Sequence, residues 1–196
     1  MWDIIFNLIA LIIAIDIHEF SHAWAAERLG DPTPRLQGRL SLNPLVHLDP
    51  IGTILLTLVH FGWGKPVQFD PFNLRNPRRD SALISIAGPV SNILLAIPVS
   101  LLVRFLPITL FTALLAQIVV MNLMLGIFNL VPIHPLDGFK IVEGILPEQQ
   151  AHEWHELERY GIIFLIFLLF PFFGGTAPIQ KIISPVIDFF IHILLP

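Results

Sequence analysis

The chain has 196 residues, of which 55% are hydrophobic and only 13% are charged, with a formal net charge of −4. Soluble domains carry about 25% charged residues, so this composition indicates a membrane protein. The small, scattered charge excludes a nucleic-acid-binding surface, and the absence of cysteine excludes disulfides and cysteine-ligated zinc. At this length we expect a single membrane-embedded domain, residues 1–196.

Three segments are long and apolar enough to cross a bilayer, which takes about 20 residues. They are 3–26, 82–106 and 109–131, and we interpret the first as a retained span because it lacks a basic signal-peptide region. The shorter apolar runs are 51–62, 161–173 and 179–195. The predicted fold class is therefore an all-α polytopic membrane protein with four to six transmembrane helices.

The segment between the first two spans is rich in Pro and Gly, which is typical of loops and short strands. We expect a re-entrant loop or short β region at 36–70. Irregular backbone at membrane depth is tolerated only inside protein or beside a water-filled cavity. The region could also pair with an extended peptide by strand addition.

The first span contains the sequence His18-Glu19-Phe20-Ser21-His22, an HExxH motif. Residues four apart share one face of a helix, so both imidazoles can reach one metal ion. Glu19 is then placed to take a proton from water, whose pKa a metal lowers to about 7. The alternative is a polar helix end at the membrane surface, but ionisable residues in a span are functional in most cases.

Two histidines leave room for a third protein ligand. The candidates are Asp137, His134, His47 and His60. We favour Asp137, which follows the third span in a Pro-rich turn and precedes Gly138, so that the backbone is extended and can turn sharply. The alternative for Asp137 is a helix-capping role in an ordinary Pro-Gly loop.

Taken together, several motifs resemble the site-2 protease family of intramembrane metalloproteases. They are HEFSH, Gly88-Pro-Val-Ser-Asn92, Gln37–Pro44, His47–Gly52, Gly62–Val67 and Asn129…Leu136-Asp137-Gly138. Within that family the chain is similar to the short prokaryotic branch without PDZ or CBS domains. The resemblance covers about residues 10–140, so the catalytic core is expected at about 3–140 and C-terminal helices at about 156–196.

The resemblance implies one Zn²⁺ per chain, held by His18, His22 and Asp137, with Glu19 as the general base. It also implies that Asn129 hydrogen-bonds the substrate or the oxyanion. The implied substrate is a single-pass transmembrane protein, such as an anti-sigma factor or a membrane-bound transcription-factor precursor. His134 departs from the family pattern and could contact substrate or compete for the metal.

Other polar residues near the motifs have two interpretations each. Asp16 either raises the pKa of Glu19 by like charge or caps a water path. His47 and Asp49 either gate substrate and support a zinc-bound histidine or are ordinary loop polar groups. For Asn92 we favour a structural hydrogen bond between helices over a chemical role.

The metal site constrains the topology. HEFSH lies in the exit half of the first span and Asp137 just after the exit of 109–131, so both spans must run in the same direction. Segment 82–106 supplies the one crossing between them, and 51–62 must then not cross. Nine of the 11 basic residues fall on the active-site side, which predicts a plasma-membrane protein with that side cytoplasmic and the N-terminus outside.

The predicted activity is intramembrane zinc endopeptidase, acting in the lipid bilayer and without nucleic acid. Two other classes of function remain open. A membrane zinc-binding or transport protein would leave Glu19 without a base role, and a non-catalytic scaffold would bind membrane proteins without cleaving them. The sequence gives no indication of oligomeric state.

Overall fold

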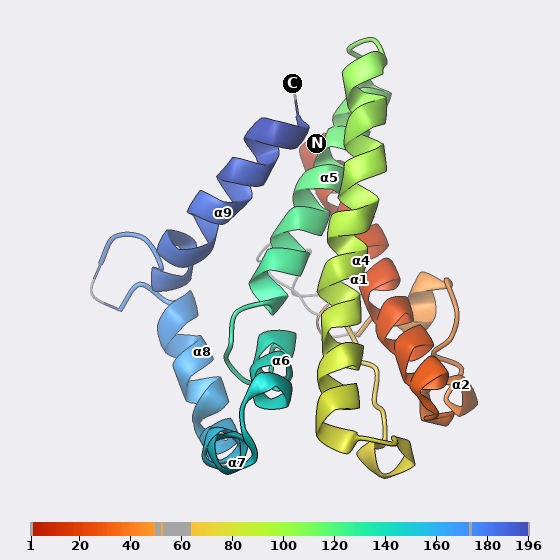
Figure 1. Ribbon diagram of the computed structural model, residues 1–196. Coiled ribbons are helices and arrows are strands. Elements are labelled where there is room, and N and C mark those ends of the chain that lie inside the picture. The colour runs from red at the N-terminus through yellow and green to blue at the C-terminus, as the bar shows by residue number, and fades with distance from the viewer. Residues whose placement is uncertain (1, 50–51, 53–63, 173, 196) are drawn as a thin grey trace.

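The computed structural model describes residues 2–49, 52, 64–172 and 174–195 (Figure 1). Its helical segments are α1 (Trp2–Leu29), α2 (Thr33–Leu36), η1 (Pro44–Val46), η2 (Pro71–Asn73), α4 (Pro77–Phe105), α5 (Leu110–Asn129), α6 (Asp137–Ile145), α7 (Glu148–His155), η3 (Glu156–Tyr160), α8 (Gly161–Leu169) and α9 (Pro178–Leu194). Within the described residues the structure contains no β-strand, and the predicted all-α membrane class is confirmed.

Three of the described helices, α1, α4 and α5, are long and apolar enough to cross a membrane. They correspond to the three spans expected from the sequence, with ends that differ by a few residues. In Figure 1, α1 and α5 run in the same direction and α4 runs against them. This is the arrangement that the proposed metal site required of the topology, because it brings the exit ends of α1 and α5 to one end of the bundle.

Small residues allow these three helices to pack closely. On α1, Ala10, Ala14, His18, His22 and Ala26 are spaced four apart, and all are buried against the neighbouring helices. Positions four apart form one stripe on a helix, and small side chains in the stripe let helix backbones approach each other. The packing stripe of α1 therefore contains both histidines of HEFSH.

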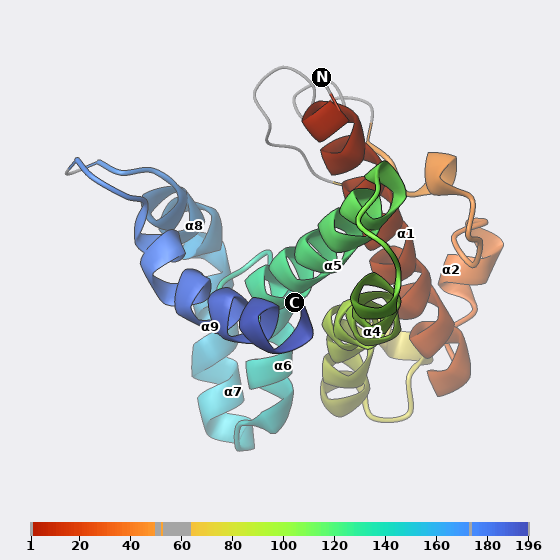
Figure 2. The ribbon, with the colours of Figure 1, turned by 90° about the horizontal axis from the view of Figure 1, so that it is seen from above.

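The C-terminal part forms a second layer beside α5. Figure 2 shows α5 between the α1–α4 pair on one side and α8 and α9 on the other. Ile187 of α9 joins a buried cluster with Ala96, Val119, Leu123 and Ile127, and Arg104 at the end of α4 donates to the carbonyl of Ile193. The helices α8 and α9 have nine and 17 residues, so the predicted spans beyond the third stay a prediction.

The segment between α1 and α4 is mostly irregular, as expected from its Pro and Gly content. The expected β region is reduced, in the part that is described, to one antiparallel bridge between Leu48 and Gly64. The expectation that 51–62 does not cross the membrane lies outside the described residues, apart from Gly52. Candidate ligand His60 also lies outside them.

Asp31 holds this irregular segment against the end of α1. One carboxylate oxygen accepts hydrogen bonds from the backbone and hydroxyl of Thr33 and from the amide of Asn73, and the other accepts from the backbone N–H of Asp70. The side chain is completely buried. Burial by itself raises the pKa of Asp31, but these hydrogen bonds outweigh it and lower the pKa below its ordinary value.

Candidate metal centre and active site

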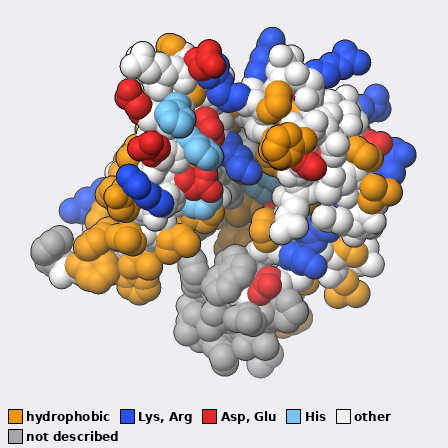
Figure 3. All heavy atoms as spheres, turned by 90° about the horizontal axis from the view of Figure 1, so that it is seen from below, with side chains coloured by type: hydrophobic (Ala, Val, Ile, Leu, Met, Phe, Trp, Pro, Cys, Tyr) orange, Lys and Arg blue, Asp and Glu red, His pale blue; other side chains and the backbone are white. Residues whose placement is uncertain are grey.

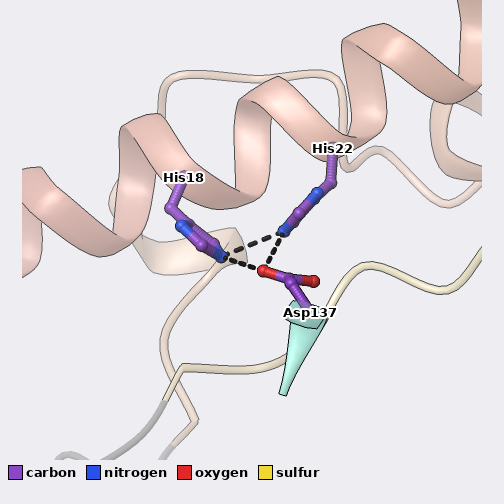
Figure 4. Close-up of side chains that lie close together, drawn as sticks. All are labelled: His18, His22 and Asp137. Atoms are coloured by element: carbon purple, nitrogen blue, oxygen red, sulfur yellow. Dashed lines mark hydrogen bonds and ion pairs between the residues drawn. The ribbon is translucent and has the colours of Figure 1, made fainter. Parts of the chain in front are cut away.

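Three side chains from two distant parts of the chain converge at one point. His18 and His22 project from α1 and Asp137 is the first residue of α6, as Figure 4 shows. The Oδ2 atom of Asp137 lies 3.0 Å from Nε2 of His18 and 3.2 Å from Nε2 of His22, and the two Nε2 atoms are 3.0 Å apart. The structure thus brings together the three metal ligands expected from the sequence.

The local sequence explains how Asp137 reaches α1. Pro132 and Pro135 prevent α5 from continuing, so the chain turns and starts a new helix at Asp137. A Cβ on Gly138 would lie 2.4 Å from the carbonyl oxygen of Leu130 and 2.5 Å from that of Val131. Only glycine permits this close approach, which holds the first turn of α6 against the end of α5.

The second nitrogen of each imidazole is already engaged. Nδ1 of His18 lies 2.7 Å from Oδ1 of Asn92, and Nδ1 of His22 lies 2.7 Å from the carbonyl oxygen of Ile84. A carbonyl oxygen only accepts, so the Ile84 contact requires the proton of His22 on Nδ1, and the Asn92 contact, with Oδ1 as the acceptor, requires the same of His18. Both Nε2 atoms then present lone pairs to each other and to the carboxylate.

This arrangement suits a cation. Oδ2 of Asp137 is buried and has no hydrogen-bond donor, although two nitrogen atoms lie within 3.2 Å of it. Three lone-pair atoms at such distances repel one another unless a positive charge lies among them. Tetrahedral zinc, with bonds of about 2.0–2.2 Å, keeps its ligand atoms about 3.4 Å apart, and the donor set fits that ion.

The surroundings of Asp137 favour its ionised form, which is the form that a metal would need. Burial by itself raises the pKa of its carboxyl group, but the charge that His22 carries when protonated, and hydrogen bonds from both imidazoles in that state, outweigh burial. In that protonated state of the imidazoles the pKa of Asp137 lies well below its usual range. A metal cation between the same atoms acts in the same direction.

Gly88 provides the space for the two imidazoles. A Cβ at this position of α4 would lie 2.5 Å from Nε2 of His22 and 2.7 Å from Cε1 of His18. No larger residue fits without moving the ligands. The glycine of the Gly88–Asn92 motif is therefore part of the site, a role that its place in an apolar span did not indicate.

Glu19 is partly buried and is held by the segment at residues 64–67. Its Oε2 accepts a hydrogen bond of 2.8 Å from the backbone N–H of Val67. This segment is fixed in turn by Arg39, whose buried guanidinium donates to the carbonyls of Val46 and Lys65. Burial lowers the pKa of Arg39 and the negative charge of Glu19 opposes that shift.

Asp16 and His47 lie together beside this segment. Oδ1 of Asp16 is 3.6 Å from Nε2 of His47, which also lies 2.7 Å from the carbonyl oxygen of Ser41. The carbonyl of His47 accepts from the N–H of Lys65, so His47 connects α1 to the irregular segment. Asp49 accepts from the N–H of Gly52. Among the described residues, His47 is the ionisable side chain that lies beside Asp16.

Asn129 and His134 are not part of the three-residue cluster. Asn129 lies at the end of α5, where its Nδ2 donates to the carbonyl of Leu125. Nδ1 of His134 lies 3.6 Å from Oε1 of Glu158, and its ring packs edge-on against Phe139. The contacts described for His134 join α6 and η3, so the cluster that can hold a metal is formed without it.

Asn122 is a residue of the site that the sequence analysis missed. It is fully buried on α5, and its Oδ1 accepts a hydrogen bond of 2.8 Å from Nδ2 of Asn92. Its own Nδ2 donates to the carbonyl of Ile118. An asparagine in the middle of an apolar span was a usable signal, because buried polar groups in spans are rare and are hydrogen-bonded.

The end of the molecule that carries the site is hollowed (Figure 3). A cavity of about 610 Å³ is lined by the start of α4, including Arg78 and Arg79, and by α6 and α7, including Glu143 and His155. A neighbouring cavity of about 340 Å³ reaches Phe69 and Lys140, and the ammonium of Lys140 lies 4.4 Å from the centre of the Phe69 ring. Lys140 is three residues after Asp137.

Comparison with known proteins identifies relatives over most of the chain. Residues 106–172 match the model of peptidase family M50. "Putative zinc metalloprotease YwhC" of Bacillus subtilis is 41% identical over 175 residues, which are 84% of this chain and 80% of that protein. No solved structure gives a significant match.

Two longer relatives give weaker matches. "Putative zinc metalloprotease Rip2" of Mycobacterium tuberculosis is 30% identical over 166 residues, 80% of this chain and 63% of that protein. "Zinc metalloprotease MJ0392" of Methanocaldococcus jannaschii is 26% identical over 152 residues, 77% of this chain and 37% of that protein. With three helices of membrane-spanning length, these matches show that the chain belongs to peptidase family M50, the zinc metalloproteases of the site-2 protease type that its motifs predicted.

Proposed function

We propose that this protein is an intramembrane zinc endopeptidase that cleaves single-pass membrane proteins. One observation carries the proposal. Nε2 of His18, Nε2 of His22 and Oδ2 of Asp137 converge within 3.2 Å of one another in a buried site where Oδ2 has no hydrogen-bond donor. The HExxH glutamate lies in the same helix, next to the first of these residues.

Zinc in this site would supply a Lewis acid that lowers the pKa of a water molecule and polarises the scissile carbonyl. Glu19 is positioned as the general base. Its Oε2 is held by the N–H of Val67, which fixes the carboxylate and leaves Oε1 to take a proton from the attacking water. Glu19 then returns that proton to the amine nitrogen as the C–N bond breaks.

Asn129 is proposed as a substrate contact. One N–H of its amide donates to Leu125, and the other is left for a substrate carbonyl or for the oxyanion. Its place at the end of α5, eight residues before Asp137, supports this role. An amide N–H directed at the developing oxyanion is a common source of transition-state stabilisation.

The location proposed for this activity is the plasma membrane, with the active-site end cytoplasmic. Seven of the nine basic residues assigned to the active-site side lie in or next to the end of α1, α2, the start of α4, α6 and η3. The other two, Arg39 and Lys65, lie in the irregular segment between α1 and α4, whereas Arg104 is in the last turn of α4 at the opposite end. The excess of Lys and Arg on cytoplasmic loops supports this orientation. The proposed substrates are single-pass proteins such as anti-sigma factors or membrane-bound transcription-factor precursors, as the resemblance to the site-2 protease family implies.

The test combines metal content with cleavage in purified protein. Wild type and Glu19→Gln are expected to bind one zinc per chain, since glutamine has the shape of glutamate and the three ligands are unchanged. His22→Ala and Asp137→Ala are expected to lose the metal. Cleavage of a reconstituted single-pass substrate is expected to fall by at least about 100-fold in Glu19→Gln.

Each other outcome points to a different function. Full cleavage by Glu19→Gln would contradict the base role and the proposed mechanism. Zinc binding with no cleavage of any single-pass substrate by wild type would favour a scaffold or a transport protein. Zinc retained in Asp137→Ala would place the third ligand elsewhere.

A further inference from the structure

A chain of buried amides connects α5 to the first histidine of the site. Asn92 and Asn122 are both completely buried, and each is hydrogen-bonded at both ends of its amide. Asn92 receives His18 Nδ1 on its Oδ1 and donates from Nδ2 to the carbonyl of Ala14 and to Oδ1 of Asn122. The distances along this path are 2.7, 2.9 and 2.8 Å.

Backbone carbonyls at the ends of the path determine the direction of every hydrogen bond in it. The carbonyls of Ala14 and Ile118 can only accept, so each asparagine must turn its NH₂ group toward one of them. Oδ1 of Asn122 then faces Asn92, and Oδ1 of Asn92 faces His18. The proton of His18 is therefore on Nδ1, and the lone pair of Nε2 faces His22 and Asp137.

The two histidines differ in the kind of group that accepts the hydrogen bond from Nδ1. Nδ1 of His22 is held by the backbone carbonyl of Ile84, which no side-chain substitution removes. The orientation of His18 depends instead on side chains, and Asn122 is the member farthest from the metal site. Such outer partners fix the tautomer and ring orientation of a ligating histidine.

We infer that Asn122 is a positioning residue for zinc, acting through Asn92 to hold His18 in its ligating orientation. The inference rests on the proposed zinc-binding function. The path joins the helix that carries both histidines, α1, to α4 and to α5, whose end leads directly to Asp137. Its hydrogen bonds lie in an apolar interior, where an unpaired amide is costly and partners are retained.

The chain provides a control hydrogen bond from the same helix, α5. Gln117 of α5 donates to Oδ1 of Asn7 of α1, and both residues are half-buried. Gln117→Leu removes an amide hydrogen bond between α1 and α5, as Asn122→Leu removes one between α5 and α4. Of the hydrogen bonds in the described residues, none joins the Gln117–Asn7 pair to His18.

The readout is zinc affinity, measured on full-length purified protein by competition with a chromogenic chelator. Asn122→Leu is expected to bind zinc about 10- to 100-fold more weakly, a range typical for outer partners of metal ligands. Gln117→Leu is expected to keep its zinc affinity within about twofold of wild type. Zinc affinity depends on the orientation of His18, and the loss of a distant contact between helices leaves that orientation unchanged. Equal losses in the two variants would overturn the inference.

A double-substitution cycle tests whether Asn122 acts through Asn92. Asn92→Leu is expected to weaken zinc binding at least as much as Asn122→Leu, and the double variant no more than Asn92→Leu alone. Additive losses would show that Asn122 acts by another route and would contradict the inference. Absence of zinc in wild type would defeat the proposed function itself, whereas zinc in wild type with unchanged affinity in Asn122→Leu would defeat the inference alone.

Asn122→Ser gives a second test if the leucine variant does not fold. A serine hydroxyl can donate to the carbonyl four residues earlier in its own helix, Ile118. It reaches less far toward Asn92, so an affinity between those of wild type and Asn92→Leu is expected. Wild-type affinity in both Asn122→Ser and Asn92→Leu would overturn the inference.

Discussion

At the scale of single residues, the structure shows how a few polar groups are tolerated inside an apolar molecule. His18, His22, Asn92 and Asn122 are buried in the spanning helices, and each has an assigned hydrogen-bond partner. Oδ2 of Asp137, at the start of α6, is buried without a hydrogen-bond donor and faces both imidazoles. A buried acceptor without a donor is costly, and in this position it supports the proposed role of Asp137 as a metal ligand.

Asp31 is the residue outside the site whose loss should matter most for stability. Its carboxylate accepts four hydrogen bonds from three residues of the segment between α1 and α4. In Asp31→Asn the amide NH₂ would face the N–H of Asp70 or the donors of Thr33 and Asn73. We expect the free energy of unfolding in detergent to fall by about 2–3 kcal/mol at pH 7.

The pH dependence of this effect follows from the lowered pKa of Asp31. The stabilisation is fully present above the unfolded pKa, which is about 3.9, and is lost as pH falls through the lower folded pKa. The difference between wild type and Asp31→Asn should therefore be constant from pH 7 to pH 5 and shrink below about pH 4. Glu153→Gln, at an exposed carboxylate of α7, is the control, and an equal effect in it would contradict the prediction.

At the scale of elements, the site is formed jointly by four parts of the chain. They are α1, α4, the start of α6 and the segment at 64–67. Helix α1 contributes the two histidines and the glutamate of the proposed site, α4 contributes Gly88 and Asn92, and the start of α6 contributes Asp137. The segment at 64–67 orients Glu19 through Val67. Metal binding and base orientation thus depend on different elements and can be separated by substitution.

Arg39→Gln is predicted to separate them. The shorter, uncharged side chain cannot bond the carbonyls of Val46 and Lys65 together, so the segment that orients Glu19 is released. Cleavage should fall on the order of 10- to 100-fold, because a small misplacement of a catalytic group is costly. Zinc content should be unchanged, since the ligands contact other elements.

Limited proteolysis supplies the structural readout for this prediction. Cleavage by added protease near residues 40–48 and 64–67 should be faster in Arg39→Gln than in wild type. Arg35→Gln is the matched control, because Arg35 is exposed and pairs with Glu27 at the surface. Loss of zinc in Arg39→Gln, or the same loss of activity in Arg35→Gln, would argue against the proposed role of Arg39 in orienting Glu19.

At the scale of the whole molecule, the outer surface is suited to lipid and the two ends differ in charge. Leu94, Leu101, Phe164 and Phe167 are among the large apolar residues exposed on the helices. Figure 3 shows the site-bearing end, where charged and histidine side chains gather around the hollow and apolar side chains extend along one side. A bilayer would cover the apolar surface and leave this end in water.

The proposed orientation predicts which end faces the cytoplasm. The chain has no cysteine, so single cysteines can report on exposure without background. Phe72, at the site-bearing end, is 95% exposed, and Ile108, in the turn between α4 and α5, is fully exposed. In intact cells, a membrane-impermeant thiol reagent should label Ile108→Cys and label Phe72→Cys only after lysis. The reverse pattern would invert the topology.

The sequence by itself determined the class of the molecule and predicted the residues of its proposed chemistry. Length and hydropathy predicted the three long helices, because about 20 apolar residues span a bilayer wherever they occur. The spacing of His18 and His22 follows from one helical turn, and the Pro-Gly context of Asp137 predicted a rigid turn. The need for α1 and α5 to run in the same direction followed from the position of the ligands alone.

The tertiary structure decided how those residues are held. The contact between His18 and Asn92 spans 74 positions, that between Glu19 and Val67 spans 48, and that between Asn92 and Asn122 spans 30. Helix periodicity is a local property, so it shows which side chains share a face but not which helix lies opposite. Packing of distant segments creates three features of the site. They are the space beside Gly88, the hydrogen bonds of Arg39 to Val46 and Lys65, and the amide path from Asn122 to His18.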